Sequence, residues 1–102
     1  MEKFEKIKND PYIFNIYHKI DNNPENDKNF WTYHGLIHVN NVIDIVEKTL
    51  IQLGYDEEYI ENAKIAALLH DLGMLGGKED HDIRSYDMAK KYLEDNNIEL
   101  KI

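Results

Sequence analysis

Residues 68–73 read LLHDLG, and this stretch closes the most apolar segment of the chain. The segment before it is small and apolar on most sides, and Asp56 with the acidic residues after it is typical of a helix N-terminus. The pattern predicts a helix at the centre of the fold. The end of that helix carries His70 and Asp71 side by side, although charged groups are costly to bury unless they are paired or bind a metal. The adjacent imidazole and carboxylate therefore need a chemical reason.

Helical spacing continues on the N-terminal side of this segment. Asp10 followed by Pro11 predicts a capped helix start. After a polar loop over residues 21–29, apolar residues recur with helical spacing over residues 35–53 and form a single face. Gly54 is a typical helix stop. These features predict two helices before the central one.

Helical spacing also follows the central segment. A glycine-rich loop is predicted over residues 73–80, and a fourth helix over residues 81–94. Residues 95–102 resemble the start of another helix, and the sequence ends within it, so we expect the domain to be truncated at the C-terminus. Because no alternating β-branched run bounded by turns is present, we expect an all-α bundle of at least four helices. Residues 1–102 are expected to form a single, incomplete domain.

Composition limits the partners and ligands that the chain can use. The net charge of −8 argues against nucleic acid and anionic membranes as partners. The absence of cysteine excludes disulfides and thiolate ligands, so a metal would be held by His, Asp or Glu. Such ligands suit Mn, Fe, Ni, Co, Zn or Mg. No apolar run reaches the length of a membrane span or a signal peptide, which favours the cytoplasm.

The candidate ligands lie on three of the predicted helices. His34 and His38 are four residues apart and share a helical face. His70 and Asp71 end the central helix, and His81 begins the next. In a regular helix, adjacent side chains diverge by about 100°, so a bend near the end of the helix is needed for both to reach one ion. A single histidine beside an apolar face is more often a hydrogen-bonded core residue than a ligand, but the combination is more specific. We interpret His18, which has no acidic partner nearby in sequence, as structural or solvated.

Two segments together resemble the HD superfamily of metal-dependent phosphohydrolases. LIHVNNVIDIV (residues 36–46) is similar to the family's first ligand-bearing helix, and AALLHDLG (66–73) to its His-Asp helix. The resemblance covers residues 31–93. It implies a helical HD-domain-like bundle in which His38, His70 and Asp71 bind a divalent metal.

The resemblance also implies roles for two further histidines. YHGLIHV (residues 33–39) is similar to the opening motif of cyclic-nucleotide phosphodiesterases, where the residue equivalent to His34 protonates the leaving oxygen. His81 lies in a segment where family members hold a second metal or contact substrate phosphate. A divalent ion would polarise a phosphoryl oxygen and lower the pKa of bound water. Asp71 would orient ligand and water, or serve as the base.

The sequence departs from the family pattern at the last ligand, an aspartate on a later helix that this chain does not match with confidence. The leading hypothesis is hydrolysis of a phosphate ester, of a nucleotide or a related small phosphorylated compound. The alternative is a non-catalytic, HD-derived module that binds metal or nucleotide. A helical scaffold with unrelated histidines is the third interpretation. Without a covering helix, the apolar face around Ala66 is expected to be uncovered, which allows a homodimer.

Overall fold

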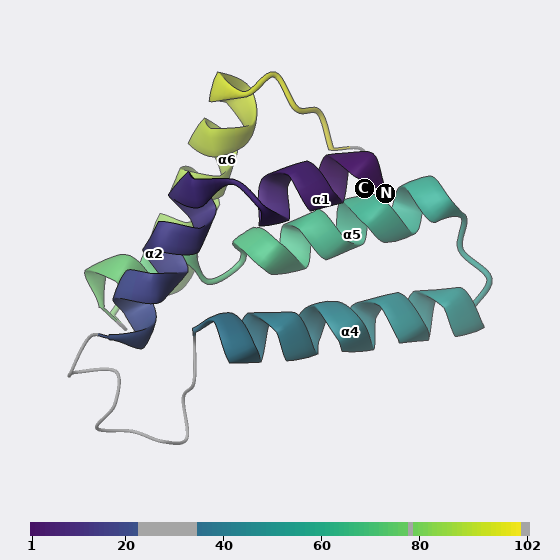
Figure 1. The fold of residues 1–102 in the computed structure, drawn as a ribbon, viewed down its shortest axis with the longest axis horizontal. Helices are drawn as coiled ribbons and strands as arrows, with labels where there is room; N and C mark the ends of the chain where they lie inside the picture. The colour runs from purple at the N-terminus through teal and green to yellow at the C-terminus, as the bar shows by residue number, and fades with distance from the viewer. Residues whose placement is uncertain (23–34, 78, 101–102) are drawn as a thin grey trace.

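The computed structural model describes residues 1–22, 35–77 and 79–100, and these ranges consist of helices joined by turns and short irregular segments, with no strand (Figure 1). In chain order the elements are α1 (Glu2–Lys8), α2 (Pro11–Asp21), α4 (Leu36–Gln52), α5 (Glu57–Leu69), the 3₁₀ helix η1 (Leu72–Gly76) and α6 (His81–Asp95). The predicted all-α class is confirmed. None of the helices in these ranges is both long and apolar enough to cross a membrane.

Helix α5 is the centre of the arrangement, as the sequence predicts. Helices α4 and α5 lie antiparallel and side by side, and α1 runs along the other side of α5 (Figure 1). Helix α2 and α6 pack around η1 at the end of α5. One continuous core joins these elements, from Phe4 on α1 to Tyr92 on α6. The C-terminal end of α5 is therefore enclosed by several elements, and this is where the site lies.

The local signals in the sequence produce the expected helix ends. The Asp10 side chain accepts from the Tyr12 backbone N–H at 2.9 Å, and the Asp56 side chain accepts from the Tyr59 N–H at 2.8 Å. Gly54 follows α4 with a φ of 85°, a left-handed conformation that suits glycine. These caps explain why the predicted helix bounds agree closely with the observed ones.

The structure differs from the sequence predictions in three chain segments. The N-terminal helix α1 was not predicted, and its Phe4 and Ile7 side chains are buried. Part of the predicted loop over 73–80 is the 3₁₀ helix η1. The expected element after residue 95 is not a helix over 98–100, where an extended segment places apolar side chains against the core.

Helix α5 is also less uniformly apolar in its packing than its sequence indicates. Asn62 and Lys64 are both buried. The Lys64 ammonium lies 2.6 Å from the Glu47 carboxylate of α4 and 4.4 Å from the centre of the Phe4 ring. A buried charge needs such partners, so this ion pair and cation–π contact join α1, α4 and α5.

The segment η1 is fastened to α6 by polar contacts at close range. The Gly73 N–H donates to Ser85 Oγ at 2.8 Å, and Arg84 donates to the carbonyls of Gly73 and Gly77, both at 2.7 Å. Arg84 also donates to the Glu79 carbonyl at 3.0 Å. This clamp fixes the path of the chain between the end of α5 and the start of α6.

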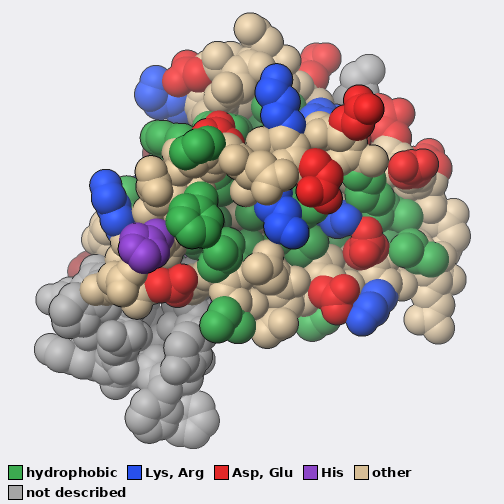
Figure 2. All heavy atoms as spheres, viewed as in Figure 1, with side chains coloured by type: hydrophobic (Ala, Val, Ile, Leu, Met, Phe, Trp, Pro, Cys, Tyr) green, Lys and Arg blue, Asp and Glu red, His purple; other side chains and the backbone are tan. Residues whose placement is uncertain are grey.

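The visible surface in Figure 2 mixes acidic, basic and apolar side chains over the same face. Acidic and basic groups are interspersed there, with no continuous basic stripe. On this face the charges of both signs are mixed, as on an ordinary solvated surface.

Candidate metal centre

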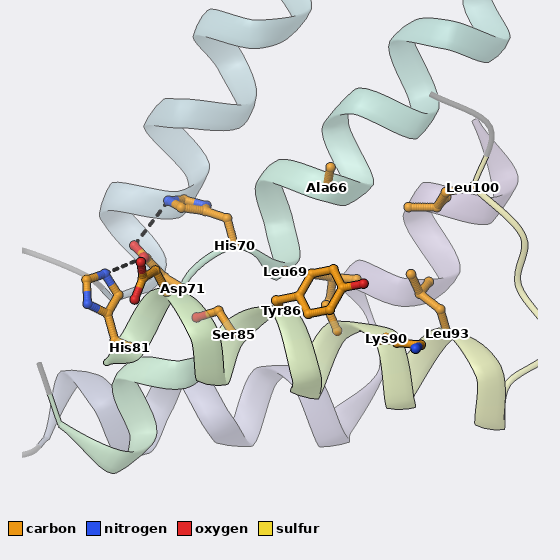
Figure 3. A pocket seen from close by; sticks show the side chains of 12 residues that line it. Ala66, Leu69, His70, Asp71, His81, Ser85, Tyr86, Lys90, Leu93 and Leu100 are labelled. Carbon is orange, nitrogen blue, oxygen red and sulfur yellow. Dashed lines mark ion pairs between the residues drawn. The ribbon is translucent and has the colours of Figure 1, made fainter. Parts of the chain in front are cut away.

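Asp71 is the centre of the candidate site. It lies just beyond the end of α5 and is 2% exposed. Its Oδ2 atom is 3.2 Å from His70 Nε2 and 3.5 Å from His38 Nε2, and its Oδ1 atom is 3.8 Å from His81 Nε2. Figure 3 shows both His70 and His81 pointing at this carboxylate. Side chains from α4, the end of α5 and α6 thus meet at a single carboxylate.

The end of α5 allows two adjacent residues to face the same point. The helix stops at Leu69, and Asp71 has a φ of −113° and a ψ of 13°, outside the α-helical range. The divergence of about 100° expected for neighbours in a regular helix therefore does not apply. The predicted bend is present: it lies at Asp71, two residues before Gly73.

A backbone contact orients the His70 ring. His70 Nδ1 lies 2.5 Å from the Ala67 carbonyl oxygen. Because a carbonyl oxygen only accepts, Nδ1 carries the proton, and Nε2 faces Asp71. In the neutral ring, Nε2 then holds the lone pair that a metal needs, a form of support typical of metal-binding histidines.

The donor set fits a divalent metal. Ligand atoms of His38, His70 and Asp71 all lie within 4.8 Å of one another. Two atoms that bind one ion at about 2.1 Å each lie at most about 4.2 Å apart, so a small rotation of the rings brings the three atoms onto one ion. Two imidazoles and a carboxylate are ligands for Zn, Fe, Mn, Ni or Co, and they do not select among these metals.

The pKa of His70 is raised, which favours the protonated, charged imidazole when no metal is bound. The hydrogen bond to Asp71 is the largest cause and raises the pKa of His70, against the opposing effect of burial. The Tyr17 phenol lies near the same carboxylate, and burial followed by repulsion from Asp71 raises its pKa. The buried Asp71 carboxylate therefore favours the protonated forms of both His70 and Tyr17.

This shift predicts how the stability of the metal-free chain depends on pH. A raised folded-state pKa contributes stability that is complete below the ordinary value of 6.5 and is lost as the pH rises through the raised value. In EDTA, we expect the His70 contribution to be larger at about pH 6 than at about pH 8.5. Urea unfolding at the two pH values measures it. His70→Gln should remove part of the difference, whereas His18→Gln, at an exposed position, should not; equal effects would contradict the assignment.

Residues far away in sequence position the ligands, and sequence patterns did not reveal them. The Asp21 side chain, at the end of α2, accepts from the Leu36 N–H at 3.3 Å, at the first residue of α4 and two residues before His38. The Tyr17 hydroxyl donates to the Leu68 carbonyl, near the end of α5. Carbonyls in the last turn of a helix lack intrahelical partners, so Tyr17 supplies one. Both contacts depend on tertiary proximity, for which the sequence carries no local signal.

Tyr17→Phe should destabilise the protein by about 1–3 kcal/mol, because the Leu68 carbonyl loses its buried partner. The phenyl ring keeps the apolar packing, so the change isolates the hydroxyl. Chemical denaturation followed by circular dichroism measures the loss. Tyr55→Phe, at a half-exposed position, is the matched control and should be close to neutral. A neutral Tyr17→Phe would show that the hydroxyl is not needed.

The remaining sequence predictions fall outside this cluster. His81 lies at its edge, closer to Asp71 Oδ1 than to the atoms that face the other two histidines. His34 lies outside the described residues, and its predicted role stays a prediction. His18 is exposed on α2, where it contacts Asn22 and stacks on Phe14. The interpretation of His18 as a solvated residue agrees with this position.

The fold and the site define a helical protein with a candidate divalent-metal centre between its helices. A family model, the HD domain, matches residues 35–101, which include all of α4, α5, η1 and α6. The chain therefore belongs to the HD-domain family. Searches of curated proteins and of solved structures gave no match.

Proposed function

We propose that this chain hydrolyses a phosphate ester with the help of a divalent metal held by His38, His70 and Asp71. The substrate would be a nucleotide or a related small phosphorylated compound. The observation that carries the proposal is the convergence of two imidazoles and a buried carboxylate inside the segment that matches the HD domain. Residues 1–102 would act as one HD-type domain.

The side chains divide the work by their positions. When bound, a divalent metal polarises a phosphoryl oxygen and lowers the pKa of water. His70 and Asp71 are oriented by the backbone and by each other, which keeps their ligand atoms in place before any ion arrives. His81 lies on the cavity side of Asp71 and would contact phosphate oxygens or a second metal. His34 is proposed as the acid that protonates the leaving oxygen.

The second candidate is a non-catalytic module that binds metal or nucleotide. Among the described residues, a single group of three possible ligands gathers at metal-binding distances, and it contains one carboxylate. This donor set holds an ion without supplying the later aspartate of the HD pattern. The observation favours binding without turnover.

Metal loading followed by a phosphatase screen separates the two candidates. The chain would be loaded with Mn²⁺, Fe²⁺, Ni²⁺, Co²⁺, Zn²⁺ or Mg²⁺ and assayed with p-nitrophenyl phosphate, bis-p-nitrophenyl phosphate and a panel of nucleotides. Turnover that EDTA removes and metal restores supports hydrolysis. Tight metal binding without turnover supports the module, and failure to bind any of the ions contradicts both.

His81→Ala should lower turnover about 10- to 100-fold, the range typical of residues that support a metal site from its edge. The affinity for the first metal ion should change little, because His81 lies outside the three-residue cluster. Steady-state kinetics and metal titration measure the two effects separately. Loss of the first metal in this variant would instead make His81 a ligand of that ion.

A further inference from the structure

A cavity of about 670 Å³ opens from the candidate metal centre and runs between α5 and α6 (Figure 3). Its polar end is formed by His70, Asp71 and His81. The rest of its lining is largely apolar and comes from Ala66, Leu69, Ala89, Leu93 and Leu100, with Tyr86 and Lys90 beside them. The volume is typical of a site for a small molecule. One cavity thus joins a charged end to an apolar groove.

The groove is long compared with a phosphate group. Figure 3 shows His81 at one end of the view and Leu93 toward the other, both on α6. Twelve residues of α helix separate them, which corresponds to about 18 Å at 1.5 Å per residue. A ligand with its phosphorus at Asp71 would extend several atoms along α6, and its other end would lie against Leu69 and Leu93.

The groove has few polar groups for a sugar. Ser85 Oγ accepts from the Gly73 N–H at 2.8 Å and points toward the Asp71 end of the cavity, away from Leu93 (Figure 3). Asp82 and Lys90 are exposed, so they border the groove rather than its apolar interior. A sugar placed along Leu69 and Leu93 would lose water from its hydroxyls and find few partners there, the Tyr86 hydroxyl and the Lys90 ammonium at the exposed rim, and each unsatisfied group costs binding free energy. An alkyl or aromatic group gains affinity from the same surface.

We propose that the site selects phosphate esters whose alcohol part is apolar, a medium-length alkyl or an aryl group. The phosphate lies at the His70, Asp71 and His81 end, and the apolar group lies along Leu69 and Leu93. The inference rests on the proposed function and narrows it: of the small phosphorylated compounds named there, it selects apolar esters over nucleotides at the same site. The chemical asymmetry of the cavity carries it.

Alkylphosphonates test the groove independently of turnover, because their carbon–phosphorus bond resists phosphate-ester hydrolysis. Calorimetry would measure the Kd of methyl-, butyl-, hexyl- and octylphosphonate for the Mn²⁺-loaded chain, with ribose 5-phosphate and adenosine monophosphate for comparison. We expect Kd to fall about three- to fourfold per methylene until the groove is filled. A Kd that is independent of chain length overturns the proposal. So does tighter binding of ribose 5-phosphate or adenosine monophosphate than of octylphosphonate.

A variant that fills the groove makes the test local. Ala89→Leu adds a larger side chain that a helix tolerates well, and it should abolish the gain for the longer phosphonates while methylphosphonate binds as before. Asp87→Leu is the matched control, since it adds leucine to an exposed position of α6 outside the groove lining, and it should keep the chain-length dependence. Circular dichroism verifies that both variants fold.

The experiment also separates this inference from its alternatives. Chain-length-dependent phosphonate binding without hydrolysis of any ester contradicts the proposed function and keeps the groove assignment. Hydrolysis of short esters, together with phosphonate binding that does not depend on chain length, supports the proposed function and contradicts the groove assignment. A second copy of the chain in the groove would give a dimer in sedimentation that octylphosphonate does not dissociate, and this result overturns the proposal.

Discussion

Asp71→Asn is expected to weaken Mn²⁺ binding more than 100-fold, beyond the 10- to 100-fold loss typical of residues that only support metal ligands. The Asp71 carboxylate lies within 4 Å of His38, His70 and His81, and its side chain is 3% exposed. Asparagine has nearly the same shape but no negative charge, and its carbonyl oxygen is a poorer ligand for a divalent ion. The two imidazoles alone would leave the positive charge of the ion uncompensated.

Metal titration with calorimetry, and metal content after gel filtration, measure this effect. Circular dichroism should show the wild-type helical content, because asparagine fills the same space. His18→Ala is the control, since it removes an imidazole from an exposed part of α2 and should leave metal affinity unchanged. An Asp71→Asn chain that binds Mn²⁺ as tightly as the wild type would exclude Asp71 as a ligand.

The parts of the fold that the sequence predicted are those with local causes. Asp10 and Asp56 act within a few residues of themselves, and so does Gly54, which is why the bounds of α2, α4 and α5 could be predicted. The α1 helix has only seven residues, and isolated helices of that length are marginal. Its stability comes from burying Phe4 and Ile7 against the rest of the core, which no local pattern shows.

In the candidate site, too, the residues with a local sequence pattern could be predicted and those that depend on tertiary contacts could not. His38, His70 and Asp71 could be named in advance because their spacing on two helices resembles a family pattern. Their supports could not be named, because Asp21 and Tyr17 reach them only through tertiary contacts. The apolar groove depends on how α6 crosses the end of α5, and that geometry is set by the packing of η1.

Gly73 decides that packing, since it lets the backbones of η1 and α6 approach closely. A Cβ atom at residue 73 would lie 2.2 Å from the His81 carbonyl oxygen and 2.5 Å from the Ser85 nitrogen. Both are backbone atoms of α6, so the clash cannot be relieved by turning a side chain. The same contact region holds the Gly73–Ser85 and Arg84–Gly73 hydrogen bonds, which a displaced helix would lose.

Gly73→Ala should therefore destabilise the protein by about 3 kcal/mol or more, at the upper end of overpacking effects. For a domain of this size the Tm would fall on the order of 15 °C. Thermal unfolding followed by circular dichroism measures the loss. Gly76→Ala is the comparison in the same 3₁₀ helix, because the atoms nearest its Cβ belong to the Arg84 side chain, at 2.6 Å from Nε, so the change disturbs an Arg84 hydrogen bond and not the approach of the α6 backbone. It should cost about 1 kcal/mol, the lower end of the same range. Equal losses in the two variants would contradict the role of Gly73, since they would show that α6 moves away from η1 as easily as the Arg84 side chain turns aside.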